Sequence, residues 1–392
     1  MTIALAPTDV ISPAARHTTT AWHIITGEYP PASGGVADYT QLVARGLAAA
    51  GDAVTVWTPS GGEADESGVT VRVLPDCYGL RSLRVLSREI DRRTSPRILV
   101  QYVPHAFGWK GGNLPFCLWL WLRRRDRPWV MFHEVAYPFD EAAPFELRAL
   151  AVVNRLMARI VSRAAHRVFV SIPAWRPDVQ KLVSADTSIE WLPVPSTLPV
   201  VDDPEITDAV RRRYAPDRPL VGSFGTFGRQ VRAQLRDCLP LLAARSDAAV
   251  LLLGRDSELM AEEIAAAHPD LARRVFGTGL LTLEQLSVHI RACDVMLQPY
   301  PDGVSTRRTS AMAALAHERA LVTTSGSLTE AFWALDHAAV LMPAGDTARI
   351  VDAAVSLLSD SSRRAMLGAR GLALYRGRFD VALTIKALRR PA

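Results

Sequence analysis

The sequence predicts an α/β protein made of two doubly wound domains of similar size that face each other across a central cleft. The chain has 392 residues, 49% of them hydrophobic and 22% charged, which suits two globular cores. Short apolar runs alternate with helical stretches, as in parallel sheets buried on both faces. One Pro-rich acidic stretch, residues 193–205, interrupts the alternation and is typical of an interdomain linker. We therefore expect two Rossmann-like domains in tandem.

The first half of the chain supplies the strands of the first domain, which we place at residues 20–195. The expected strands are 22–26, 53–58, 69–74, 98–102, 129–133, 167–171 and 189–193. Amphipathic patterns such as 36–50 and 145–165 lie between them and predict helices. Residues before about position 20 are rich in Thr, Ala and Pro and are interpreted as an arm outside the domain.

The alternation restarts after the linker and predicts a second domain over residues 196–370. Its expected strands are 219–224, 248–254, 274–279, 294–300, 319–324 and 338–343. No repeat with a period of 20–50 residues is visible, so a solenoid is excluded.

The composition limits the kinds of partner and the cellular compartment that we expect for this chain. The formal net charge of +5 is modest for this length and does not favour nucleic acid as a partner. Four scattered cysteines without metal-ligand spacing, and no basic segment followed by an apolar run near residue 1, predict a cytoplasmic protein. The sequence contains no metal-ligating cluster, so we expect no metal and no cofactor. It does not define the oligomeric state.

Residues 113–127 join an apolar run to a basic run. One interpretation is an interfacial patch for a lipid acceptor or a membrane surface, which would give peripheral contact with the inner face of a membrane. The other, which we favour, is a buried helix whose C-terminal dipole is capped by arginines. The apolar part, residues 114–122, is too short to span a bilayer.

Two glycine-rich turns follow predicted strands. Gly34 and Gly35 precede a helix in the first domain, where backbone N–H groups can approach a phosphate, although a simple tight turn is the alternative. Gly225 lies in the second turn, residues 221–232, and is followed by Arg229 and Arg232. Backbone donors and guanidinium groups together suit a diphosphate, whereas the alternative is a turn with exposed arginines.

The stretch 275–324 is the most informative. A strand ends in Asp302, Gly303 and Val304, and we expect a helix to begin near Ser305. A carboxylate at a strand end can hold sugar hydroxyls, and a helix N-terminus can hold phosphate.

This stretch resembles the C-terminal signature of the retaining glycosyltransferases of family 4, which have the GT-B fold. The residues that carry the resemblance follow the family's order and are Gly279, residues 292–295, Pro299, residues 302–303, residues 311–313 and residues 321–322. Residues 34–36 resemble the family's Gly-Gly-Val loop, and His133-Glu134 resembles its His followed by an acidic residue. The resemblance covers roughly residues 22 to 360.

The resemblance implies transfer of a sugar from a nucleoside diphosphate to an acceptor hydroxyl of a glycolipid, polysaccharide or secondary metabolite, with retention and without a metal. It implies that His133 and Asp302 are catalytic and that Val304, Ser305 and Ser310 help bind the donor. It places Tyr102, His105 and Glu134 on the acceptor side. It also implies that a C-terminal helix within 371–392 packs back onto the first domain.

The sequence departs from the family at the nucleotide end of the donor site. The family's second Glu falls on Ser310, which cannot accept two hydrogen bonds from a ribose diol as a carboxylate does. The family's Lys has no counterpart, so Arg229 and Arg232, with Arg307 and Arg308 in reserve, would neutralise the diphosphate. The alternative function is therefore a catalytically weakened GT-B scaffold or a sugar- or nucleotide-binding subunit.

Overall fold

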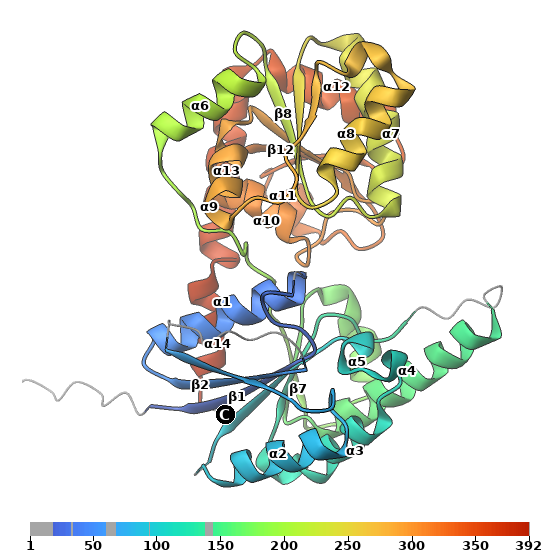
Figure 1. The fold of residues 1–392 in the computed structure, drawn as a ribbon, viewed down its shortest axis with the longest axis vertical. Coiled ribbons are helices and arrows are strands. Elements are labelled where there is room, and N and C mark those ends of the chain that lie inside the picture. The colour runs from blue at the N-terminus through green and yellow to red at the C-terminus, as the bar shows by residue number, and fades with distance from the viewer. Residues whose placement is uncertain (1–18, 33, 60–67, 94, 138–143, 392) are drawn as a thin grey trace, which may run out of the picture.

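The computed structural model describes residues 19–32, 34–59, 68–93, 95–137 and 144–391. The N-terminal arm expected from the sequence lies almost wholly outside these residues. Two α/β domains are stacked along the longest axis of the molecule (Figure 1). This is the fold class that the sequence predicts, and every expected strand is present.

The first domain contains a seven-stranded sheet in the order β3-β2-β1-β4-β5-β6-β7, and all neighbouring strands are parallel. Its strands are β1 (Ala21–Thr26), β2 (Ala53–Thr58), β3 (Val69–Val73), β4 (Arg97–Tyr102), β5 (Trp129–Phe132), β6 (Arg167–Val170) and β7 (Ser188–Trp191). The winding reverses between β1 and β4, and such a switch point is where open α/β sheets bind ligands.

Helices cover both faces of this sheet because its strands are apolar on both sides. One face packs against α1 (Gly35–Ala49). The other packs against the remaining helices of the domain, which are α2 (Leu80–Asp91), α3 (Leu114–Leu122), α4 (Phe145–Ala164) and α5 (Arg176–Gln180).

The second domain has a six-stranded sheet in the order β10-β9-β8-β11-β12-β13, again wholly parallel. Its strands are β8 (Leu220–Phe224), β9 (Ala249–Leu253), β10 (Val275–Gly277), β11 (Val295–Gln298), β12 (Ala320–Ser325) and β13 (Val340–Pro343). The switch point here lies between β8 and β11, so the loops after these strands face the cleft.

Two groups of helices cover the second sheet. One face carries α7 (Arg229–Arg245), α8 (Ser257–Ala267) and α12 (Thr347–Leu358). The other carries α6 (Pro204–Tyr214), α9 (Leu283–Ala292), α10 (Thr309–Ala316), α11 (Phe332–Leu335) and α13 (Ser361–Arg378).

One helix starts later than the sequence suggests. We expected a helix from about Ser305, but α10 begins at Thr309. The preceding backbone donors have partners elsewhere, because Val304 donates to the Thr324 carbonyl (2.7 Å) and Thr306 donates to the Glu330 carboxylate (3.0 Å). Residues 302–308 therefore form a loop held by β12 and by Glu330.

The same loop connects the two domains. The Thr306 hydroxyl donates to the Ser171 carbonyl of the first domain (2.8 Å), and the Val194 amide of the linker donates to the Thr306 carbonyl (3.1 Å). Trp191 Nε1 donates to the Thr306 hydroxyl at 3.2 Å. These contacts place the 302–308 loop against the first domain.

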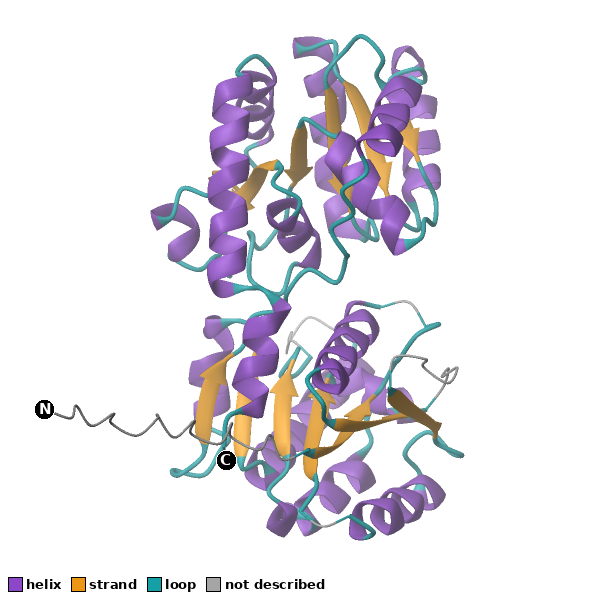
Figure 2. Cartoon of the chain, turned by 90° about the vertical axis from the view of Figure 1, so that its left-hand side faces the viewer, coloured by secondary structure: helices purple, strands orange, loops and turns teal. Residues whose placement is uncertain are grey.

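The chain crosses back to the first domain at its C-terminal end. Helix α13 packs within the second domain, whereas α14 (Val381–Arg389) packs beside α1 (Figure 2). Ile385 and Leu388 are buried against the first domain, and Arg97 donates to the Leu388 carbonyl at 2.8 Å. Arg389 forms an ion pair with the buried Asp52 carboxylate at 3.1 Å. The chain passes from the second domain to the first at residues 379–380, between α13 and α14. The sequence had placed the start of this C-terminal segment at residue 371.

Candidate active site between the two domains

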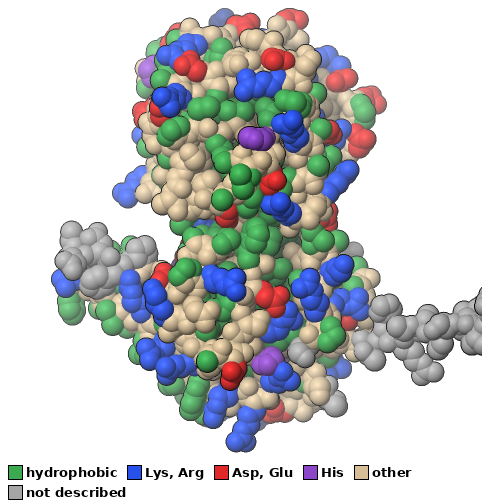
Figure 3. Space-filling view, turned by 180° about the vertical axis from the view of Figure 1, so that it is seen from behind, with side chains coloured by type: hydrophobic (Ala, Val, Ile, Leu, Met, Phe, Trp, Pro, Cys, Tyr) green, Lys and Arg blue, Asp and Glu red, His purple; other side chains and the backbone are tan. Residues whose placement is uncertain are grey.

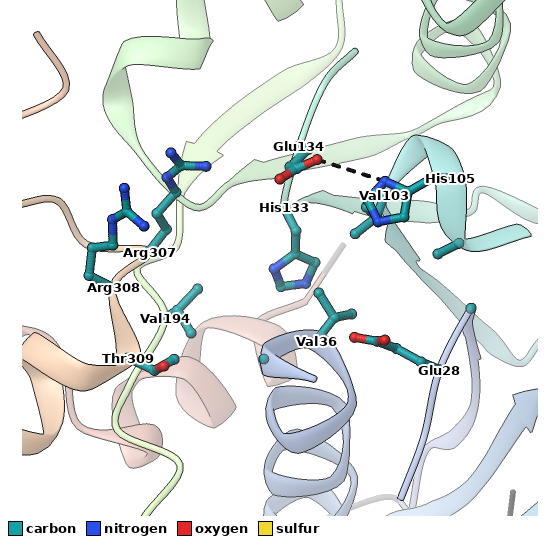
Figure 4. A pocket seen from close by; sticks show the side chains of 13 residues that line it. Glu28, Val36, Val103, His105, His133, Glu134, Val194, Arg307, Arg308 and Thr309 are labelled. Atoms are coloured by element: carbon teal, nitrogen blue, oxygen red, sulfur yellow. Dashed lines mark ion pairs between the residues drawn. The ribbon is translucent and has the colours of Figure 1, made fainter. Parts of the chain in front are cut away.

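A cavity of about 490 Å³ lies where the carboxyl ends of both sheets meet. The first domain contributes residues from the loops after β1, β4 and β5, and the second domain contributes residues 307–309. Figure 4 shows Arg307 and Arg308 on one side of the cavity and Glu28, Val36 and His105 on the other. The site therefore needs both domains.

The N-terminus of α1 forms one wall of the cavity. Gly35 lines the cavity, and a Cβ atom there would meet nothing within 4 Å. Gly34 is different, because a Cβ atom there would lie 2.5 Å from Glu28 Oε1. Glu28 accepts a hydrogen bond from the Ala37 amide at 3.2 Å, so a carboxylate already caps this helix. Glu28 was not among the residues predicted from the sequence.

A second carboxyl group adjoins this helix start. Burial, together with a smaller contribution from the neighbouring Glu28, raises the pKa of Asp38 to about 6. Two acidic side chains therefore lie at the start of α1, Asp38 in its first turn and Glu28 in the loop after β1, and they make this end of the cleft more acidic than the glycine pair alone suggests.

His133 follows β5 and its ring points into the cavity in Figure 4. It is 8% exposed, its Nε2 lies 2.8 Å from Gln101 Oε1, and its ring contacts Tyr39 edge-on at 5.0 Å. Burial lowers the pKa of His133 to about 3, so the imidazole is neutral near pH 7. With the Gln101 amide oxygen facing the ring, Nε2 donates and Nδ1 is left as an acceptor.

Asp302 lies between two arginines. Arg307 donates to Asp302 Oδ2 at 2.8 Å, and Arg308 donates to Asp302 Oδ1. Burial alone would raise the pKa of Asp302, but Arg308 and Arg307 lower it below its ordinary value. The carboxylate is therefore ionised and holds both guanidinium groups.

Each guanidinium group also stacks on an aromatic ring. Arg307 lies 5.5 Å from the ring centroid of Trp175, and Arg308 lies 4.7 Å from that of Tyr300. Their Nε atoms are buried and have no hydrogen-bond partner among the described atoms. Two cations held by Asp302 thus line the cavity, which suits an anionic ligand.

The other predicted donor residues lie outside the lining of this cavity. Arg232 forms an ion pair with Glu263 at 2.8 Å, and Arg229 is exposed at the start of α7. Gly225 follows β8 and donates to the Leu253 carbonyl. Nothing in the structure assigns Arg229 or Arg232 to a ligand, and their role stays a prediction.

Val304, Ser305 and Gly303 are buried in the loop after β11. The Ser305 hydroxyl has no hydrogen-bond partner among the described atoms, whereas the Ser310 hydroxyl lies 2.8 Å from the Tyr300 hydroxyl. The Ser310 hydroxyl is therefore engaged with a side chain of its own domain. It stays a predicted contact for the ribose of a donor.

On the predicted acceptor side, two residues line the cavity and one does not. His105 and Glu134 face each other across 4.0 Å between Nδ1 and Oε2, as the dashed line in Figure 4 marks. Tyr102 is 0% exposed, and its ring packs against Phe107 and Phe132. We therefore correct its assignment to a core residue, because both faces of the parallel sheet are covered.

A second cavity, of about 620 Å³, shares Glu134 and Arg307 with the first. Tyr137, Trp175, Arg155 and Lys181 line it. This cavity was not predicted from the sequence. The available signal was Trp175, which closely follows a predicted strand that ends at the cleft edge.

On the face shown in Figure 3, acidic and basic side chains are mixed on the second domain, basic side chains predominate on the first, and the molecule narrows between the two domains. No group of three or more metal-ligating side chains is found among the described residues, and no helix among them is long and apolar enough to cross a membrane. The first finding leaves the predicted absence of a metal requirement untested.

Both halves of the chain match known protein families. Residues 34–195 match the family described as "Glycosyl transferase 4-like domain", and residues 218–360 match "Glycosyl transferases group 1". No curated protein matches the chain in sequence.

Solved glycosyltransferase structures share the whole fold. Sucrose-phosphate synthase from Thermosynechococcus elongatus has a TM-score of 0.71 at 19% identity, over 94% of this chain and 98% of that one. HepE from Anabaena, in complex with UDP and glucose, has a TM-score of 0.69 at 12% identity, with the same coverage. WaaG, a glycosyltransferase involved in lipopolysaccharide biosynthesis, has a TM-score of 0.65 at 13% identity and again covers 94% and 98%. At these identities the likeness establishes the fold.

Proposed function

Because the chain belongs to the family 4 glycosyltransferases, with the GT-B fold, we propose that it transfers a hexose-type sugar from a nucleoside diphosphate to an acceptor hydroxyl with retention. Structures of HepE contain UDP and UDP-glucose, which supports a nucleotide sugar as the donor here.

One observation carries the proposal. Arg307 and Arg308 face the glycine-rich start of α1 across a single cavity, at the carboxyl ends of both sheets. Guanidinium groups donate to phosphate oxygens, and at the start of α1 a phosphate would take up backbone amides beside the Ala37 amide that Glu28 already caps. A diphosphate bound between them would touch both domains and would place the attached sugar near His133.

The leaving diphosphate is where the arginines act in this proposal. Negative charge develops on the leaving oxygen as the glycosidic bond breaks, and prearranged cations stabilise that charge. Asp302 keeps both guanidinium groups in position before the donor arrives. In such retaining enzymes the protein need not supply a nucleophile, and an oxygen of the donor phosphate takes the proton of the acceptor hydroxyl.

His133 would then orient the donor sugar. A neutral imidazole with Nδ1 as an acceptor can receive a hydrogen bond from a sugar hydroxyl, and Gln101 fixes the ring. Glu134, which faces His105, lines both this cavity and the second one, which we assign to the acceptor. Trp175 and Tyr137 offer aromatic faces on which a sugar ring can stack.

The direct test is to incubate the full chain with a panel of nucleoside diphosphate sugars and to measure release of nucleoside diphosphate with and without candidate acceptors. We expect slow hydrolysis of one donor, faster release when a suitable acceptor is added, and an unchanged anomeric configuration by NMR. Inversion would refute retention, and inertness towards every donor that binds would refute the proposed transfer.

A second function, a binding subunit of low activity, is favoured by one specific observation. Ser310 replaces the carboxylate expected at the ribose end, and its hydroxyl already pairs with Tyr300. Calorimetry separates the two functions, because a binding subunit would bind the donor without turnover. Ser310→Glu would then be expected to tighten donor binding.

A further inference from the structure

A groove of about 460 Å³ runs between α2 and α3 on the outside of the first domain, apart from the cleft residues described above. Its floor and walls are largely aliphatic and are formed by Leu80, Leu83, Pro115, Leu118, Trp119 and Leu122. Three of these leucines are well exposed: Leu80 by 64%, Leu118 by 50% and Leu122 by 68%. Soluble surfaces seldom gather exposed leucines in this way without a partner.

Helix α3 is apolar around its whole circumference, which explains the patch. Phe116, Cys117 and Leu120 face the core and are buried, so the other side of the helix turns Leu118 and Leu122 to solvent. Residues 113–127 therefore combine features of both interpretations, the buried helix and the apolar surface patch. One side of α3 is a core helix, and the other side is an apolar surface.

Basic side chains border the groove. Arg84 and Arg88 of α2 line it directly, and both are exposed. Arg124 and Arg125 follow the end of α3, and the Arg124 guanidinium lies 4.3 Å from the ring centroid of Trp121.

The acidic residues that flank the groove are largely ion-paired, although two of them share one arginine. Glu89 pairs with Arg92, while Asp91 and Asp126 both pair with Arg123. Among the described residues, Arg84, Arg88 and Arg125 form no ion pair. The excess charge around the apolar groove is therefore positive.

We propose that this α2–α3 face binds the surface of a lipid bilayer that contains anionic phospholipids. Leu118 and Leu122 would enter the boundary between headgroups and acyl chains, and the bordering arginines would contact the lipid phosphates. Exposed leucines suit the apolar boundary of the acyl chains, and the arginines beside them suit the phosphates above it. The long arginine side chains allow their charges to stay at the level of the headgroups while the leucines enter more deeply.

The charge distinguishes this occupant from a second copy of the chain. In a two-fold dimer the same face meets itself, which would bring Arg84, Arg88 and Arg125 against their own copies. The apolar groove likewise does not suit nucleic acid, whose backbone offers no aliphatic surface. The proposal is independent of the transfer reaction and is tested without any donor.

The test is co-sedimentation of the full chain with two kinds of vesicle, one of phosphatidylcholine alone and one of phosphatidylcholine mixed with phosphatidylglycerol. We expect binding to the mixed vesicles, weak binding to the neutral ones, and release as salt is raised. Leu118→Glu/Leu122→Glu should abolish binding. Arg84→Glu/Arg88→Glu should weaken it by about 30-fold or more, because each basic residue contributes roughly a factor of five.

Arg370→Glu/Arg376→Glu is the matched control. It makes the same charge change at two exposed positions on α13, in the other domain, and should bind vesicles like the parent. An equal loss of vesicle binding in this control would show that only the overall charge of the protein matters, and it would overturn the proposal. Equal binding of the parent to both kinds of vesicle would overturn it as well. Absence of binding, or a dimer in analytical ultracentrifugation that the leucine variant dissolves, would also overturn it. Circular dichroism checks that each variant is folded.

Discussion

At the scale of single residues, Asp302 is the side chain on which most of the candidate site depends. Its two carboxylate oxygens hold Arg307 and Arg308, which in turn line the cavity between the domains. The sequence predicted a catalytic carboxylate that contacts the donor sugar. The contacts in the structure add a positioning role, because both oxygens are engaged with guanidinium groups.

Asp302→Ala should therefore lower turnover by about a hundredfold or more while the protein stays folded, since two charged donors lose their fixed positions together. Steady-state kinetics with the accepted donor measures this loss. Asp352→Ala, which removes an exposed carboxylate paired with Arg245 on the far side of the domain, is the control and should retain activity. Near-normal turnover of Asp302→Ala would remove Asp302 from the site.

His133 gives a prediction on pH. Its pKa of about 3 in the folded protein lies below the ordinary 6.5, so it stays neutral in the fold while the unfolded chain takes up a proton below pH 6.5. The free energy of unfolding should therefore fall as the pH drops from 6.5 towards 3, by up to about 1.4 kcal/mol per pH unit from this group.

Urea unfolding at several pH values measures that slope. His133→Asn should show a shallower fall than the parent, and the difference isolates His133 from His23, whose pKa is also lowered, to about 4. Turnover of the parent should show no titration of His133 between pH 6 and pH 8. Equal slopes in the two proteins would mean that His133 is not buried in its neutral form.

At the scale of helices and strands, the sequence was sufficient wherever a pattern is local. All expected strands occur because each is a short run rich in apolar or β-branched residues between turn residues; the run 249–253 is wholly apolar, whereas 69–73 alternates. The start of α10 was misplaced because hydrogen bonds to Thr324 and Glu330, distant in the sequence, draw residues 304–306 out of the helix.

Side-chain partners were equally hard to foresee. Arg232 appeared free to bind phosphate, but Glu263 on the neighbouring helix pairs with it. Tyr102 appeared to end a strand at the cleft, but its ring turns into the core. Arg307 and Arg308, in contrast, were named from the sequence as reserves, and only the fold reveals that they face α1.

Helix α14 yields a test at this scale. Leu388 is 1% exposed and packs in the core beside α1, whereas Leu383 on the same helix is 38% exposed. Leu388→Ala should cost about 2–5 kcal/mol in the unfolding of the first domain, because it leaves a cavity in that core. Leu383→Ala should cost far less. Similar small effects from both substitutions would show that α14 does not stabilise the first domain.

At the scale of the whole molecule, the candidate site exists only because two sheets present their carboxyl ends to each other. Thr306 ties the loop of the second domain to Ser171 and to the linker, and α14 returns to the first domain. One connection thus runs from the second domain through the 302–308 loop, and the other through the C-terminal helix α14. Together they fix the distance between the two domains across the cavity. The family resemblance found in the sequence agrees with this architecture and with both family matches.

The central claim is that Arg307 and Arg308 hold the diphosphate of a nucleotide sugar in the cleft. Isothermal titration calorimetry with nucleoside diphosphates tests it most directly, on the parent, on Arg307→Ala/Arg308→Ala, and on Arg236→Ala as a control, whose guanidinium lies on α7 and pairs with Glu263. Each lost charged hydrogen bond costs about 1.5–3 kcal/mol, so the double variant should bind the preferred nucleotide more than a hundredfold more weakly. The control should bind like the parent. Unchanged affinity in the double variant would contradict the account and would place the diphosphate elsewhere, with the Arg229 turn as the next site to test.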